Sequence, residues 1–139
     1  GPDGMIGGQV LDILSEGKFI LKDALIELQS LKTGKLIYAS CVAGCILAGA
    51  DDTKINFAGK YASNFGLAFQ ISDDLLELKE NSTSSDEKLK KATFPAIVGI
   101  EESRRILCEL LKDTIDILSK FENSEFLIKL TNNLINREK

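Results

Sequence analysis

The sequence predicts an all-α fold. Apolar residues along most of the 139-residue chain recur every three or four positions, which is the period of an amphipathic helix. No stretch of useful length alternates apolar and polar residues, as a half-buried strand would, and no segment is repeated. The length suits a single domain spanning residues 1–139.

Composition excludes several classes of function. The chain is 44% hydrophobic, carries a net charge of −4 and contains no histidine. These values favour a globular protein, and they argue against nonspecific binding to nucleic acid or to anionic membranes. Without histidine, the commonest general base and zinc ligand are missing. The three cysteines, Cys41, Cys45 and Cys108, lie in apolar surroundings and are expected to be reduced thiols of a cytoplasmic protein.

The first half of the chain predicts two helices. The first runs from Met5 to Leu14 and ends at the glycine of segment 16–18. The second reaches from Asp23 to about Gly49 and is interrupted at 32–35 (KTGK). From 36 to 48 it is apolar on every face, so it should be covered on all sides. The uncharged run is shorter than the roughly 18 residues needed to span a bilayer, which indicates a buried helix and no membrane span.

The second half of the chain predicts a long helix over 53–78, followed by a polar loop over 79–90. A further helix begins near 93–95, where proline is tolerated in the first turn. Residues 101–121 form a clearly amphipathic segment, and 123–136 form the last helix.

The stretch 65–77 (FGLAFQISDDLLE) is an apolar run that ends in three carboxylates. Asp73 and Glu77 stand four residues apart and share a helix face, and Asp74 leans toward the same side. Gln70 lies one turn earlier, also on that side. Three acids at the end of a buried-looking helix repel one another, so a hard divalent cation such as Mg²⁺ would compensate them. A solvated acidic helix end is the alternative interpretation.

Further polar groups stand at helix ends and breaks. Lys32 and Thr33 occupy the glycine-containing interruption, Lys91 follows the polar loop, and Gln9 and Asp12 form a pair within the first helix. Each of them also has an ordinary interpretation as a surface residue. Together they place carboxylates on one helix and lysines on neighbouring elements. That combination suits a ligand with several phosphates, bridged to the acids by Mg²⁺ and bound directly by lysine.

Four segments, in order, resemble motifs of the trans-isoprenyl diphosphate synthases, and the bacterial farnesyl diphosphate synthase branch is the most similar. They are 4–12 (GMIGGQVLD), 32–34 (KTG), 69–77 (FQISDDLLE) and 91–95 (KATFP). Glu77 replaces the last aspartate of the family's second aspartate-rich motif. The resemblance implies the C-terminal half of the isoprenoid synthase helical bundle.

The resemblance also implies an activity, a cofactor and site residues. The implied reaction belongs to isoprenoid biosynthesis: a Mg²⁺-dependent prenyltransferase condenses isopentenyl diphosphate with an allylic diphosphate. The implied site residues all lie within the matching motifs. They are Asp73 on Mg²⁺ with Asp74 and Glu77 in support, Lys32 and Lys91 on the allylic diphosphate, and Gln70 and Thr33 beside the developing cation.

The resemblance covers only the C-terminal half of the family's usual chain, and the first aspartate-rich motif is absent. The 139 residues are therefore expected to be inactive alone. Their leftover apolar surface should be covered by self-association or by a separate N-terminal half chain. A second hypothesis is a non-catalytic helical remnant or regulatory subunit that acts as an interaction module. The third is a generic helical bundle with an acidic helix end.

Overall fold

The computed structural model describes residues 1–18, 20–80 and 92–136. Within these ranges the regular structure is entirely helical, as the sequence predicts. The elements are α1 (Met5–Ser15), α2 (Lys22–Gln29), the π-helix η1 (Ser30–Gly34), α3 (Lys35–Leu47), α4 (Asp52–Glu80), α5 (Phe94–Val98), α6 (Ile100–Leu118) and α7 (Glu125–Asn136).

Helix boundaries follow the local signals in most places. The hydroxyl of Thr93 caps α5 by accepting a hydrogen bond from the backbone N–H of Ala96 at 3.4 Å. Gly99, with φ of 89°, separates α5 from α6 in a conformation that favours glycine. Some ends differ from prediction by two or three residues: α3 ends at Leu47, α4 continues to Glu80, into the predicted loop, α6 ends at Leu118, before residue 121, and α7 begins at Glu125, after residue 123.

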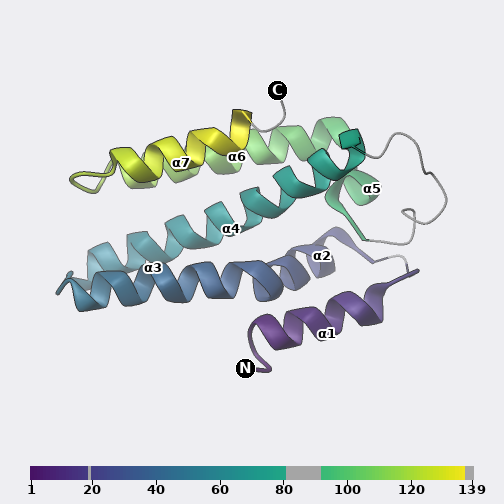
Figure 1. The fold of residues 1–139 in the computed structure, drawn as a ribbon, viewed down its shortest axis with the longest axis horizontal. Helices are drawn as coiled ribbons and strands as arrows, with labels where there is room; N and C mark the ends of the chain where they lie inside the picture. The colour runs from purple at the N-terminus through teal and green to yellow at the C-terminus, as the bar shows by residue number, and fades with distance from the viewer. Residues whose placement is uncertain (19, 81–91, 137–139) are drawn as a thin grey trace.

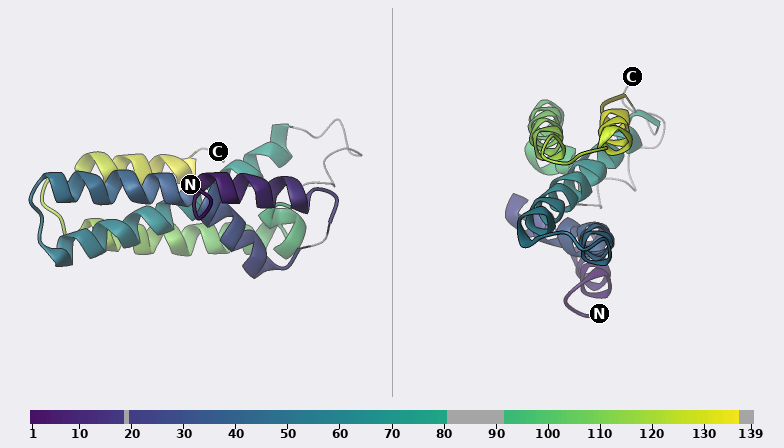
Figure 2. Two further views of the ribbon diagram at one scale, coloured as in Figure 1. Left: turned by 90° about the horizontal axis from the view of Figure 1, so that it is seen from below. Right: turned by 90° about the vertical axis from the view of Figure 1, so that its left-hand side faces the viewer.

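Helix α4 lies in the middle of the molecule (Figure 1). The end-on view in Figure 2 shows α6 and α7 on one side of α4 and the α2–η1–α3 rod on the other. Helix α1 lies outermost, beyond η1, with which it makes extensive contact. The predicted motifs of the first helix, the break and the long acidic helix are thus stacked in neighbouring layers.

The hydrophobic core lies chiefly between α4 and α6. The apolar stripe of α6 faces α4, and α7 and α5 close the sides of the core. Burial of these side chains supplies the main driving force for folding of the segment. The fully buried or nearly buried members are Leu25, Tyr61, Ala62, Phe65, Ala68, Ile71, Leu75, Phe94, Leu107, Leu111, Leu118 and Leu134.

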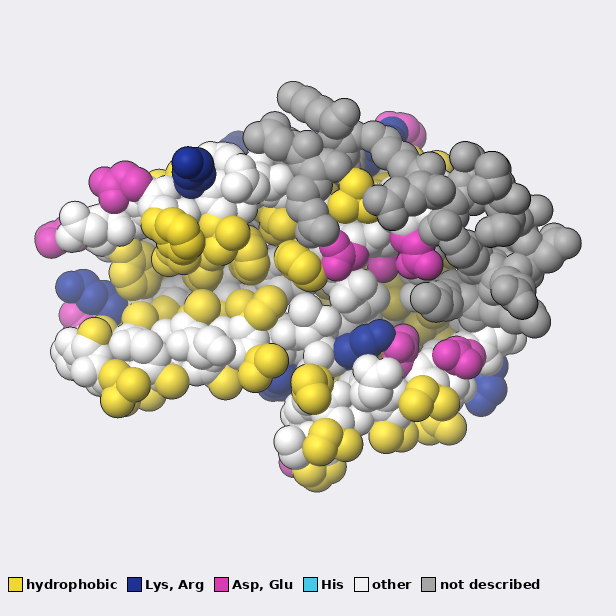
Figure 3. Space-filling model, viewed as in Figure 1, with side chains coloured by type: hydrophobic (Ala, Val, Ile, Leu, Met, Phe, Trp, Pro, Cys, Tyr) yellow, Lys and Arg dark blue, Asp and Glu magenta, His cyan; other side chains and the backbone are white. Residues whose placement is uncertain are grey.

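Helix α3, in contrast, contains no buried residue although its sequence is apolar on every face, so the prediction that residues 36–48 form a buried helix covered on all sides is wrong. Leu47 is 88% exposed and Ile46 is 58% exposed. Large apolar side chains of α1 are exposed as well, among them Ile13 and Leu14. Figure 3 shows hydrophobic side chains along both helices. The predicted leftover apolar surface is therefore confirmed, and most of its large side chains come from α1 and α3.

A membrane-spanning helix would have to be both long and apolar. None of the helices within the described ranges combines the length and the apolar character that crossing a bilayer requires.

Candidate active site

The break in the α2–α3 rod is a π-helix over residues 30–34, close to the interruption predicted at 32–35. It is held between two glycines of neighbouring helices. A Cβ atom on Gly8 of α1 would lie 2.3 Å from the backbone nitrogen of Lys32. On the other side, a Cβ atom on Gly66 of α4 would lie 3.0 Å from Cα of Gly34. The backbones of α1 and α4 therefore pack directly against the backbone of the break. Single π-turns inside helices are frequently found at functional sites.

Lys32 leaves this break toward α1. Its Nζ donates a hydrogen bond to Asp12 Oδ2 at 2.5 Å, and both side chains are about one-third exposed, 33% and 36%. The sequence marks Asp12 as a polar residue in an apolar helix and does not assign it to the site. The two residues are twenty positions apart, so only the packing of α1 on the break reveals the pair. The ion pair gives the lysine a defined direction.

Thr33 and Gln70, both predicted, meet across the interface of η1 and α4. The Thr33 hydroxyl donates to Gln70 Oε1 at 3.2 Å, and Gln70 Nε2 donates to Asp74 Oδ1 at 3.2 Å. The second oxygen of Asp74, Oδ2, accepts the backbone N–H of Phe94 at 2.9 Å. One chain of hydrogen bonds thus joins the π-helical break, the acidic motif and the start of α5. The contact of Asp74 with Phe94 is not predictable from the motifs.

Asp74 is 5% exposed, and its environment shifts its protonation. Burial raises the pKa of Asp74 to about 6. The hydrogen bonds from Phe94 and Gln70 lower the pKa in part, whereas the charges of Glu77 and Asp73 raise it further. The mutual repulsion expected of the three acids is therefore present at this position.

Asp73 and Glu77 lie one turn apart on α4, and both are half-buried. Carboxylate oxygens are the ligands that Mg²⁺ prefers, so the donor chemistry of this pair fits the cation. Among the described residues no group of three acidic, cysteine or histidine side chains is arranged to hold a metal ion. The pair would therefore form part of a coordination sphere completed by other oxygen donors. Lys91 lies outside the described residues.

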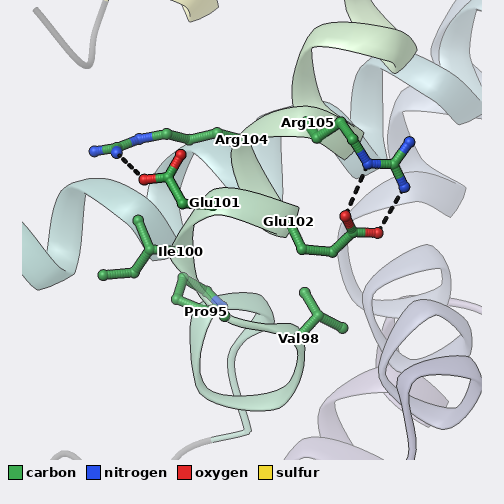
Figure 4. Close-up of a pocket in the computed structure, with 8 residues that line it drawn as sticks. Pro95, Val98, Ile100, Glu101, Glu102, Arg104 and Arg105 are labelled. Carbon is green, nitrogen blue, oxygen red and sulfur yellow. Dashed lines mark hydrogen bonds and ion pairs between the residues drawn. The ribbon is translucent and has the colours of Figure 1, made fainter.

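A separate pocket of about 940 Å³ lies between α5 and the start of α6 (Figure 4). Its charged side chains neutralise one another: Arg104 pairs with Glu101 at 3.0 Å and Arg105 pairs with Glu102 at 2.7 Å. None of the predicted site residues that the structure describes lines it. Its lining residues are Pro95, Val98, Gly99, Ile100, Glu101, Glu102, Arg104 and Arg105.

Comparison with known proteins places these features in a family. The family model of polyprenyl synthetase matches residues 3–129. A dimethylallyltranstransferase from Fischerella ambigua is 39% identical to the chain over an alignment of 145 residues, gaps included. The alignment covers 99% of the chain and 42% of that protein. The chain therefore spans less than half the length of this curated relative.

Solved structures share the fold. The apo structure of an FPP/GFPP synthase from Zymomonas mobilis matches with a TM-score of 0.84 and 31% identity, covering 96% of this chain and 46% of that one. A geranyltransferase from Helicobacter pylori, complexed with magnesium and isoprenyl diphosphate, matches with a TM-score of 0.74 and 25% identity, covering 98% and 48%. With most of its length matched by the family model, the chain belongs to the polyprenyl synthetase family.

Proposed function

We propose that the chain is the C-terminal half of a farnesyl diphosphate synthase-like prenyltransferase of isoprenoid biosynthesis. In this reaction an allylic diphosphate ionises, the double bond of isopentenyl diphosphate attacks the allylic carbon, and a proton is lost. The observation that carries the proposal is the hydrogen-bonded chain from Thr33 through Gln70 to Asp74. It brings residues of two separate predicted motifs together at one place.

The acidic end of α4 is the proposed metal-binding part of the site. Asp73 is the leading ligand for Mg²⁺, with Glu77 and Asp74 in support. When bound, Mg²⁺ supplies positive charge that stabilises the departing diphosphate. The half-buried setting of Asp73 and Glu77 strengthens their attraction for a cation, because fewer water molecules screen the charge.

The break carries the proposed substrate contacts. Lys32 and, from the sequence alone, Lys91 bind the allylic diphosphate, where an ammonium group acts as a point charge. Thr33 and Gln70 lie beside the allylic carbon, where their oxygen atoms favour the developing positive charge. The Asp12 carboxylate orients Lys32 through their ion pair.

The apolar surface of α1 and α3 is the proposed interface with the rest of the enzyme. Its occupant is either a separate N-terminal half or a second copy of the chain. Helix α3 supports this proposal, because it exposes large apolar side chains such as Leu36, Ile46 and Leu47, which is unfavourable in water.

Activity measurements with complementation test the proposal. The chain is incubated with Mg²⁺, isopentenyl diphosphate and geranyl diphosphate, with and without an N-terminal half taken from a farnesyl diphosphate synthase. We expect turnover only in the mixture, and we expect Asp73→Ala to abolish it. Robust turnover by the chain alone would contradict its incompleteness. Absence of turnover in every mixture would contradict the split enzyme.

A non-catalytic interaction subunit is the second candidate, and the exposed α3 helix favours it equally. Calorimetry separates the two functions, with pyrophosphate and Mg²⁺ as the probe. The prenyltransferase predicts Mg²⁺-dependent binding that Asp73→Ala weakens at least tenfold. The interaction subunit predicts no binding by either protein.

A further inference from the structure

Asp74 is the buried acid of its motif, and both of its carboxylate oxygens accept hydrogen bonds. Oδ2 accepts the Phe94 N–H at 2.9 Å, and Oδ1 accepts from Gln70 Nε2 at 3.2 Å. The residue is 5% exposed. Such burial limits the access of a cation to the carboxylate, and each oxygen has already committed one of its lone pairs to a hydrogen-bond donor.

The chemistry of these groups fixes the direction of the hydrogen bonds. An ionised carboxylate can only accept, so Gln70 must turn its NH₂ group toward Asp74. The amide oxygen of Gln70 then faces Thr33, and the Thr33 hydroxyl must donate its hydrogen to it, as the 3.2 Å contact requires. The lone pairs of the Thr33 oxygen are left for other partners.

We propose that Asp74 is a positioning residue that sets the direction of the hydrogen bonds through Gln70 to Thr33, so that Thr33 presents an acceptor and no donor to the substrate. The inference rests on the proposed function for the place of the allylic group beside Thr33. There, an oxygen with its hydrogen committed elsewhere favours positive charge, whereas a free hydroxyl hydrogen would disfavour it. The support that Asp74 gives to the metal is thus indirect.

Asp74→Asn tests the direction with almost no change of shape. The Phe94 N–H still needs an acceptor, so the oxygen of the new amide faces Phe94 and its NH₂ group faces Gln70. Gln70 must then rotate its amide, offer its oxygen to residue 74 and donate to Thr33. The Thr33 hydroxyl becomes an acceptor and its hydrogen is released.

A double variant restores the original direction. In Asp74→Asn with Gln70→Glu, the amide at 74 donates to the carboxylate at 70, whose other oxygen accepts from Thr33 again. Net charge matches that of the native chain. Gln70→Glu alone sets two carboxylates against each other and is expected to destabilise the fold.

NMR on the complete labelled chain reads the direction directly. In Asp74→Asn the side-chain amide resonances of Gln70 and the methyl resonance of Thr33 should shift, whereas the matched neighbour variant Asp73→Asn should leave both near their native positions. The double variant should return the Thr33 methyl resonance to within a small fraction of that shift. An unshifted Thr33 in Asp74→Asn, or a double variant that stays shifted, would overturn the proposal.

Binding measurements distinguish a positioning residue from a ligand. Using Mg²⁺ with pyrophosphate, we expect Asp73→Asn to weaken binding at least tenfold and Asp74→Asn to weaken it less than threefold. Equal losses would make Asp74 a ligand and overturn the proposal. If the native chain binds neither Mg²⁺ nor pyrophosphate, the proposed function fails. The NMR shifts still decide the direction of the hydrogen bonds in that case. If Asp74→Asn does not fold, the double variant decides. The proposal is supported when the double variant folds and shows the native Thr33 resonance. The proposal is overturned when the double variant does not fold.

Discussion

Asp74 links the acidic motif to protein stability through its protonation. Its pKa is raised to about 6, chiefly by burial, above the 3.8 of an ordinary aspartate. The folded state therefore binds this proton more tightly than the unfolded state does. The resulting stability is fully present below the unfolded pKa and is lost as the pH rises through about 6.

Asp74→Asn should remove this pH dependence. From linkage, the native chain should lose on the order of 2–3 kcal/mol of unfolding free energy between about pH 4 and pH 7 because of this group. The asparagine variant should show a flatter profile across that window. Urea unfolding at a series of pH values measures both.

Asp113, exposed on α6, provides the matched control, and Asp113→Asn should keep the native pH profile. A native chain whose stability rises steadily from pH 4 to pH 7, with Asp74→Asn following the same curve, would contradict the assigned burial of Asp74.

At the scale of elements, the backbone contact between α1 and the π-helix leaves less room for a side chain than any other glycine contact between two helices in the described residues. Gly8→Ala would place a methyl group 2.3 Å from the Lys32 nitrogen, so α1 has to move away from the break. We expect a loss of about 1–3 kcal/mol in unfolding free energy, the usual cost of overpacking. We also expect the 2.5 Å ion pair of Asp12 and Lys32 to lengthen. Chemical denaturation and a structure of the variant measure the two effects.

Gly44→Ala is the control for helix propensity. Gly44 lies in α3, and outside its own stretch of helix no atom comes within 4 Å of the position that an alanine methyl group would take. This variant should be neutral or more stable by up to about 1 kcal/mol. A Gly8→Ala protein as stable as Gly44→Ala would show that α1 is not held at backbone distance.

Two apolar helices of the chain should respond differently to truncation of a leucine. Leu111 of α6 is 1% exposed and packs in the core, so Leu111→Ala should cost about 2–5 kcal/mol. Leu47, at the end of α3, is exposed, and Leu47→Ala should stay within about 0.5 kcal/mol in the monomeric chain. Thermal unfolding at low protein concentration compares them; equal losses would mean that α3 is covered.

The sequence predicts the helices well because their signals are local. The apolar stripe of α6, the glycine at 99 and the proline at 95 each act on their immediate neighbours. It also places the break within two residues, since Gly34 interrupts a strong helical pattern. The π-turn itself is not predictable in this way, because its hydrogen-bond register depends on α1 and α4 pressing on both sides.

The sequence predicts which residues form the candidate site, but it does not predict all of the hydrogen bonds and ion pairs that these residues make. Thr33, Gln70 and Asp74 are all predicted from motifs, and the structure brings them into contact. The partners of Lys32 and Asp74, namely Asp12 and the Phe94 N–H, come from distant segments. Long-range pairs of this kind depend on how helices pack, which helical periodicity does not encode.

At the scale of the whole molecule, the uneven distribution of apolar residues has a consequence for assembly. Helices α1 and α3 expose large apolar side chains, whereas the apolar stripe of α6 is buried against α4. Water disfavours such a surface in proportion to its area, so a monomer is expected to pair when no partner is present. The purified chain should therefore sediment as a dimer or larger species, with a mass that rises with concentration.

Charged substitutions on this surface should shift the equilibrium to the monomer. Leu36→Lys combined with Ile46→Lys adds two charges to exposed positions of α3, 61% and 58% exposed, and should leave the core intact. Asn56→Lys combined with Asn133→Lys adds the same charge at exposed polar positions of α4 and α7 and should leave association unchanged. Sedimentation velocity over a hundredfold range of concentration compares the three proteins. A native chain that stays monomeric throughout would show that the apolar surface does not drive self-association, and would leave a separate N-terminal half as its proposed occupant.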